Sequence, residues 1–201
     1  MNKLRLTLFA SLLLFCCEDG VKDSSDSSLE LNMKKWQSQN FSSYRMNLDV
    51  SCFCIPAPNI EIRVNNEKIS LINGENFTDD DLQNKFWHAR TVEDLFEFIE
   101  DNLSRDPHEK KLKYNETFGY PEKVYFDIDE MTADDEIEFL VNSLNPIQAG
   151  CIDESKISDN PCIEIYDPVC GCDRATYANS CKASVVGISS WTPGVLSLIH
   201  I

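Results

Sequence analysis

Five cysteines near the end of the chain carry the side chains best suited to chemistry. They are Cys151, Cys162, Cys170, Cys172 and Cys181. Thiols at this density either bind a metal ion or form disulfides. Their spacing suits no common zinc site and no histidine lies nearby, so disulfides are expected. The segment that holds them, residues 149–195, is too short to bury a sufficient apolar core, and cross-links would replace that core.

The residues around these cysteines follow the pattern Cys-x7-Cys-Gly-x-Asp-x-x-Thr-Tyr-x-Asn-x-Cys. Its fixed positions are filled by Cys162, Cys170, Gly171, Asp173, Thr176, Tyr177, Asn179 and Cys181. On these residues the segment resembles a Kazal-type serine protease inhibitor module. The resemblance implies a disulfide between Cys162 and Cys181, and closing a loop of that length contributes about 3 kcal/mol.

A Kazal module presents an extended loop that a serine protease binds like a substrate and releases slowly. The reactive loop implied here consists of Ile163, Glu164, Ile165 and Tyr166. Glu164 would be the primary specificity residue, with the reactive bond directly after it. Asn179 would hydrogen-bond the backbone on both sides of that bond, and Tyr177 would pack beneath it. The alternative for Asn179 is an ordinary turn residue.

The acidic side chain of Glu164 restricts the class of protease. A trypsin-like pocket carries its own carboxylate, and burying a second, unpaired one there is costly. The residue favours a glutamate-preferring endopeptidase or a broad subtilisin-like enzyme as partner. A non-inhibitory alternative remains, because Kazal units of the follistatin type bind other extracellular proteins in adhesion without blocking proteases.

The cysteine pattern departs from the conventional one after Cys181. Conventional modules have a further cysteine where residues 183–184 stand, and no cysteine at the position of Cys172. The missing and the extra cysteine compensate if Cys151 pairs with Cys172, and this is the bridge we expect.

The end of the chain departs as well. A last cysteine is expected after Val195, but residues 196–201 read as the translation of a common sequencing adapter. We expect this hexapeptide to be foreign to the natural chain, which leaves Cys170 unpaired in this version.

The beginning of the chain resembles a bacterial lipoprotein signal. Lys3 and Arg5 precede an apolar run that is too short to span a bilayer, so residues 1–17 are predicted to be a signal with Cys17 as the lipidated residue. Cys16 is the alternative. Lipidation would anchor the protein in the bacterial cell envelope, as an outer-membrane lipoprotein facing the periplasm or exposed at the surface. Residues 18–28 are acidic and serine-rich, as in a flexible tether.

The charge of the whole chain excludes one class of partner. It has 34 acidic against 18 basic side chains. Nucleic acid is therefore not an expected partner.

Residues 29–148 show alternating helical and strand patterns. A short helix before Asn40 is followed by a strand over 44–52 and a hairpin over 60–71 that turns at 65–66. Thr91 and Asp94 form a capping box for a second helix, and three more strands follow around 112–114, 123–128 and 136–141. This order predicts an α+β domain, an antiparallel sheet with two helices, and it would also fit a twofold α-β-β-β repeat.

This middle segment is similar to a bacterial domain of unknown function, number 6174 among such families. The residues that carry the resemblance are Trp36, Tyr44, Cys52-Phe53-Cys54, Leu95 to Ile99, Tyr114 to Pro121, and Ala133 to Ile137. The family has no assigned activity, so the resemblance implies an outline of the fold and no function.

Three other groups of side chains are candidates for chemistry. Cys52 and Cys54 are expected to form a tight local disulfide, with a redox or metal role as the alternative. The acidic run 127–136 lacks the glycine and ligand spacing of a calcium loop and reads as a solvated turn. His88 and His108 have no accompanying nucleophile or metal dyad, so neither an enzyme nor a cofactor is expected.

Overall fold

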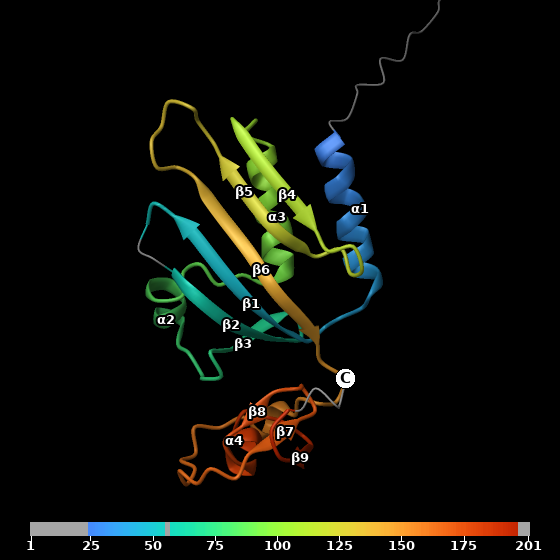
Figure 1. The fold of residues 1–201 in the computed structure, drawn as a ribbon, viewed down its shortest axis with the longest axis vertical. Coiled ribbons are helices and arrows are strands. Elements are labelled where there is room, and N and C mark those ends of the chain that lie inside the picture. Colours follow the sequence, from blue (N-terminus) through green and yellow to red (C-terminus); the bar gives the residue numbers. More distant parts are fainter. Residues whose placement is uncertain (1–23, 55–56, 197–201) are drawn as a thin grey trace, which may run out of the picture.

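The computed structural model describes residues 24–54 and 57–196 (Figure 1). The predicted signal with Cys17, the first part of the predicted tether, and residues 197–201 lie outside the described residues. Among the described helices, none is both long and apolar enough to cross a membrane.

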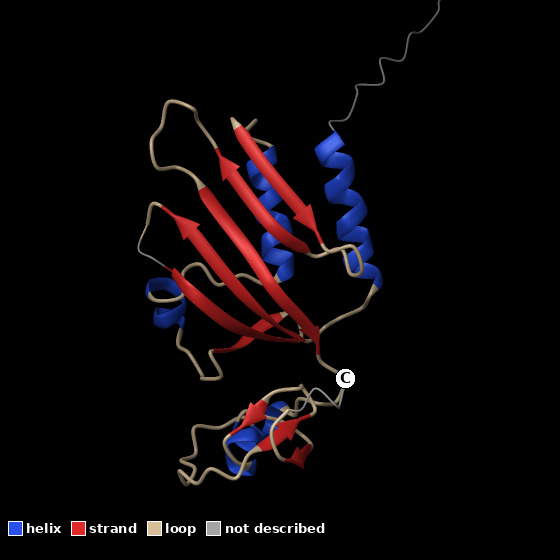
Figure 2. Ribbon diagram, in the orientation of Figure 1, coloured by secondary structure: helices blue, strands red, loops and turns tan. Residues whose placement is uncertain are grey.

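A six-stranded antiparallel sheet forms the larger part of the molecule (Figure 2). Its strands are β1 (Tyr44–Cys52), β2 (Ala57–Asn65), β3 (Lys68–Ile72), β4 (Glu109–Tyr114), β5 (Pro121–Asp127) and β6 (Ile137–Pro146). The spatial order is β3-β2-β1-β6-β5-β4, so two three-stranded meanders meet where β1 pairs with β6.

Three helices accompany the sheet, α1 (Ser24–Ser38), α2 (Asp79–Asn84) and α3 (Val92–Leu103). The last two begin with complete capping boxes, Thr78 with Asp81 and Thr91 with Asp94. In each box the threonine hydroxyl accepts from the third backbone amide of the helix and the acid accepts from the threonine amide, so two otherwise unpaired donors are satisfied.

The main core lies between one face of the sheet and the two long helices. From Tyr44 to Val50 on β1 the residues of even number are buried and those between them are half-buried, as strand alternation requires. The helices contribute Leu29, Trp36, Val92, Leu95, Phe96 and Ile99 to this core. The opposite face of the sheet is left for other contacts.

The C-terminal segment folds into a small second unit below the sheet in Figure 1. It contains a 3-10 turn (Glu154–Lys156), β7 (Val169–Gly171), β8 (Thr176–Tyr177), α4 (Ser180–Val185) and β9 (Trp191–Pro193). The strands form a three-stranded sheet in the order β8-β7-β9.

The predicted fold class, α+β with an antiparallel sheet and a small disulfide-containing unit, is confirmed. Two boundaries differ. Helix α1 begins at Ser24, so residues 24–28 are helical and not part of a tether. The first hairpin turns at Asn66 and Glu67, which both have positive φ, while Asn65 still pairs with Lys68 in the ladder.

Candidate functional site

The predicted reactive loop is an irregular, solvent-exposed segment ahead of β7. Ile163, Ile165 and Tyr166 are 67%, 57% and 73% exposed, although two are aliphatic and one aromatic. The side chain of Glu164 between them is 80% exposed. Exposed apolar side chains of this size in one short loop are a feature of binding surfaces.

Asn179 connects this loop to the body of the module. Its Nδ2 donates to the carbonyl oxygen of Ile163 at 3.0 Å and to that of Ile165 at 2.8 Å. The two carbonyls stand on either side of Glu164, so one amide group holds the backbone on both sides of the expected reactive bond. The Oδ1 of the same side chain caps α4 by accepting from the amide of Lys182 at 3.0 Å.

Two disulfides fix the module. Cys162, at the start of the loop, is joined to Cys181 on α4. Cys151 is joined to Cys172, the pairing expected for the altered cysteine pattern. Among the described residues Cys170 is the free cysteine. The loop is therefore held covalently at its first residue and by hydrogen bonds around Glu164.

Glu164 and Lys182 form an ion pair within the module. The Nζ of Lys182 lies 2.8 Å from the Oε1 of Glu164. Both side chains are substantially exposed, so the pair is screened by solvent and contributes little to stability. The sequence pattern does not include this lysine.

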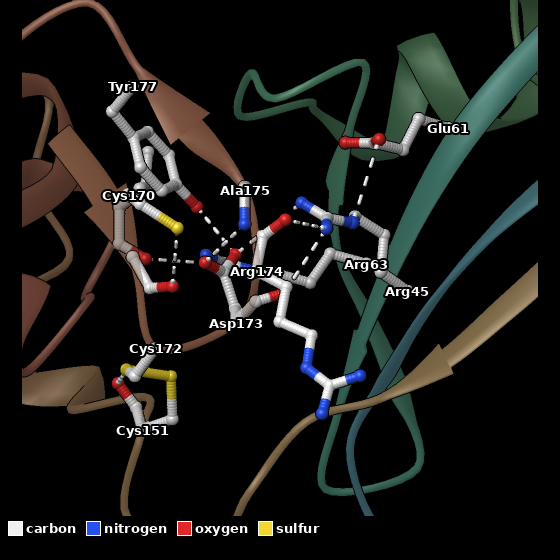
Figure 3. A network of polar contacts seen from close by, with 12 residues as sticks. Arg45, Glu61, Arg63, Cys151, Cys170, Cys172, Asp173, Arg174, Ala175 and Tyr177 are labelled. Carbon is white, nitrogen blue, oxygen red and sulfur yellow. Dashed lines mark hydrogen bonds and ion pairs between the residues drawn. A yellow bond between two sulfur atoms is a disulfide. The ribbon is translucent and has the colours of Figure 1, made fainter. Parts of the chain in front are cut away.

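Tyr177, which we expect to pack beneath the loop, lies against the small core of the C-terminal unit. Its hydroxyl donates to the Oδ2 of Asp173 at 2.7 Å (Figure 3). Burial, together with the neighbouring carboxylate, raises the pKa of Tyr177 far above the ordinary tyrosine value, so the phenol stays a donor. Gly171 leaves room for this pair, because a Cβ there would lie 2.5 Å from Asp173 Oδ1 and 2.9 Å from the tyrosine ring.

Arginine side chains of the large sheet reach into the small unit, which the sequence did not predict. The Nη2 of Arg45 donates to the carbonyl oxygens of Asp173 at 3.1 Å and Arg174 at 2.9 Å (Figure 3). Its Nη1 lies 3.7 Å from the Oδ2 of Asp173. Asp173 is only 1% exposed, so Arg45 brings a positive charge from the sheet to a buried carboxylate that also accepts hydrogen bonds within its own unit.

The other candidate residues lie elsewhere in the fold. Cys52 and Cys54 are joined at the end of β1. His88 is 1% exposed, and neither of its ring nitrogens has a hydrogen-bond partner among the described residues. His108 is exposed and precedes β4. The described residues contain no group of three or more side chains that could hold a metal ion.

A cleft of about 470 Å³ lies beside α1 and α3. Glu93, on its wall, accepts hydrogen bonds from Trp36 Nε1 at 2.7 Å and from the Tyr44 hydroxyl at 3.1 Å. That hydroxyl in turn accepts from the amide of Val92 at 2.8 Å, the first residue of α3. These hydrogen bonds join α1 and α3 to β1, so Glu93 and the Tyr44 hydroxyl have a structural role in the cleft wall.

Comparisons with known proteins agree with this division of the chain. The model of a family of unknown function (DUF6174) matches residues 28–146. The model of the Kazal-type serine protease inhibitor domain matches residues 153–184. No curated protein and no solved structure matches the chain. The predicted fusion of these two families is confirmed.

Proposed function

The chain belongs to the family of unknown function DUF6174 and carries a Kazal-type module behind it, and we propose that it is an exported, lipid-anchored serine protease inhibitor. Kazal domains are a family of inhibitors and not of enzymes. The inhibitor acts through residues 163–166, which a protease binds in the manner of a substrate.

The observation that carries this proposal is the double hydrogen bond from Asn179 to the carbonyls of Ile163 and Ile165. When a protease attacks the bond after Glu164, the two new chain ends stay attached to the module, one through the Cys162 disulfide and both through Asn179. The ends cannot diffuse apart, so the cleaved bond is readily rejoined and the enzyme remains occupied.

Rigidity of the loop accounts for tight binding. A flexible peptide loses conformational freedom when it docks, whereas a loop already held by a disulfide and by Asn179 loses little. The exposed side chains of Ile163, Ile165 and Tyr166 then supply apolar contact area to the substrate groove.

Glu164 selects the target. Its carboxylate enters the pocket of a glutamate-preferring endopeptidase or of a broad subtilisin-like enzyme that tolerates it. In a trypsin-like pocket two carboxylates would face each other in a desolvated site, which excludes tight binding.

The sheet domain fits the role of a spacer between membrane and inhibitor. The first described helix, α1, starts at the end of the sheet away from the small unit (Figure 1). A lipid on Cys17, a few residues before that helix, would place the reactive loop on the far side of the domain from the membrane.

A titration with a panel of serine proteases tests the proposal. We expect stoichiometric inhibition of a glutamate-preferring enzyme and none of trypsin. Glu164→Pro should abolish the first, and Glu164→Arg should create inhibition of trypsin. No inhibition of any protease by the wild type, and none of trypsin by Glu164→Arg, would refute the inhibitor.

A second candidate function is a non-inhibitory adhesion module of the follistatin type. The altered cysteine pattern, in which Cys151 pairs with Cys172, favours it. In that case the exposed loop binds another extracellular protein, and no member of the protease panel is inhibited at any concentration.

A further inference from the structure

The Kazal module packs against the face of the large sheet that is turned away from the helices. Arg45 on β1 and Arg63 on β2 are neighbours in the ladder, and Leu71 on β3 continues the same row. All three are turned toward the module. Arg63 is 3% exposed, and the side chain of Arg45 is 13% exposed.

Hydrogen bonds cross this boundary, some buried in its centre and others exposed at its edge. Arg45 reaches Asp173 and Arg174 as described above. Arg63 donates from Nη2 to the carbonyl oxygen of Val186 at 2.6 Å, and its Nε is held by the hydroxyl of Ser70 at 3.2 Å. At the rim, Asn65 and Asn66 donate to Glu154, at 2.7 Å and 2.9 Å.

Apolar packing crosses the boundary as well. Leu71 of β3 and Ile147, which follows β6, are 2% and 8% exposed. They belong to the same core cluster as Val169, Ala183 and Ile188 of the module. The module thus completes its small core with side chains of the sheet domain.

We propose that Arg45 is a positioning residue for the reactive loop, and that the sheet, through Arg45, Arg63 and Leu71, replaces part of the stabilisation that a conventional module obtains within itself. A short chain of contacts connects Arg45 with the loop. Arg45 pairs with Asp173, and Asp173 accepts a hydrogen bond from the hydroxyl of Tyr177. Two residues after Tyr177, Asn179 donates hydrogen bonds to the backbone on both sides of Glu164.

The backbone reports on this connection at two amides. The amide of Ala175 donates to Asp173 Oδ1 at 3.1 Å. The amide of Asp167, just past the loop, donates to the carbonyl of Ala178 at 2.9 Å, next to Asn179. If Arg45 positions the loop, both amides become less protected when Arg45 is lost.

Hydrogen exchange of the full chain tests the inference. In Arg45→Met we expect the amides of Ala175 and Asp167 to exchange at least about tenfold faster, while Leu48 and Phe126 in the centre of the sheet are unchanged. Arg45→Lys should recover part of the protection. Arg105→Met, at an exposed arginine after α3, is the matched control and should change nothing.

Asp173→Asn completes a double-mutant cycle. It should speed exchange at the same two amides, and adding Arg45→Met to it should have less than the sum of the separate effects, because the two side chains act as a pair. If Arg45→Met unfolds the whole chain, so that Leu48 exchanges as well, Asp173→Asn decides by the same two amides.

The inference rests on the proposed function only in what the positioned loop does, and the two fail separately. If the two amides lose protection in Arg45→Met but the wild type inhibits no protease, the positioning role of Arg45 stands and the proposed inhibitory function is refuted. If inhibition is present and exchange in Arg45→Met and Asp173→Asn equals that of the control, the positioning role is overturned. Where both hold, the inhibition constant of Arg45→Met should rise by a similar factor.

Discussion

The Nζ of Lys182 lies 2.8 Å from the Oε1 of Glu164, so the side chain that we expect to enter a protease pocket is already paired within its own module. An exposed pair of this kind is worth at most about 1 kcal/mol. It can therefore steady the carboxylate without preventing its transfer into a pocket.

The first prediction follows from this small energy. Lys182→Met should change the inhibition constant toward a glutamate-preferring protease by less than about fivefold. Titrations at low and high salt measure the effect, with Lys156→Met, at another exposed ion pair, as control. A much larger loss would mean that Lys182 itself contacts the protease.

The two roles of Asn179 can be separated by one atom. Asn179→Asp keeps the oxygen that caps α4 but removes the amide that donates to the loop. Two lost hydrogen bonds at about 0.5–1.5 kcal/mol each should weaken inhibition roughly 5- to 150-fold, with faster cleavage after Glu164. Asn179→Ala loses the cap as well and should also be less stable. Equal inhibition by wild type and Asn179→Asp would contradict the bracing role.

The two kinds of cysteine pair should differ in their contribution to stability. Cys162 and Cys181 are 19 positions apart, and replacing both with serine should lower the free energy of unfolding by about 3 kcal/mol. Cys52 and Cys54 are 2 positions apart and close a much smaller ring, so their replacement should cost about half as much. Denaturant unfolding measures both, and only the first change should abolish inhibition.

Tyr44 ties β1 to the start of α3. Tyr44→Phe leaves the amide of Val92 buried without a partner, which should cost about 1–3 kcal/mol of unfolding free energy. Tyr125→Phe, on the opposite face of the sheet, is the control. A loss no greater than that of the control would show that water replaces the hydroxyl.

His88 should make stability depend on pH. Burial, with Arg90 nearby, lowers the pKa of His88 below 6.5 in the folded chain. Below pH 6.5 the unfolded chain therefore binds the proton more readily, so stability is complete above that pH and declines as the pH falls toward the folded pKa. Urea unfolding above and below pH 6.5 should show this slope in wild type and in the exposed control His108→Gln. The slope should shrink in His88→Leu, and an unchanged slope would assign it to other groups.

Local patterns predicted most of the elements of this fold. The alternation of buried and polar residues identified β1, and Thr91 with Asp94 marked the start of α3, because a capping box is a short-range signal. The order of the strands was not predictable in this way. β1 and β6 pair although most of the domain separates them in sequence, so no hairpin turn indicates their pairing.

The site was predicted to a similar extent. The spacing of the cysteines and the position of Asn179 predicted where the reactive loop lies, because that pattern is local in sequence. Arg45 gave no signal, since a polar residue alternating with buried ones in a strand normally faces water. Its partner Asp173 lies 128 positions away, and only the folded chain shows that the pair is buried.

Leu71 and Ile147 have a consequence for how the Kazal module can be transferred between genes or engineered. These two side chains of the sheet domain belong to the small core of the module. A module moved alone into another gene would therefore expose apolar surface and leave Asp173 without the positive charge of Arg45. The unit that can be transplanted is the pair of domains together, and a shortened version intended for secretion or display must begin no later than α1.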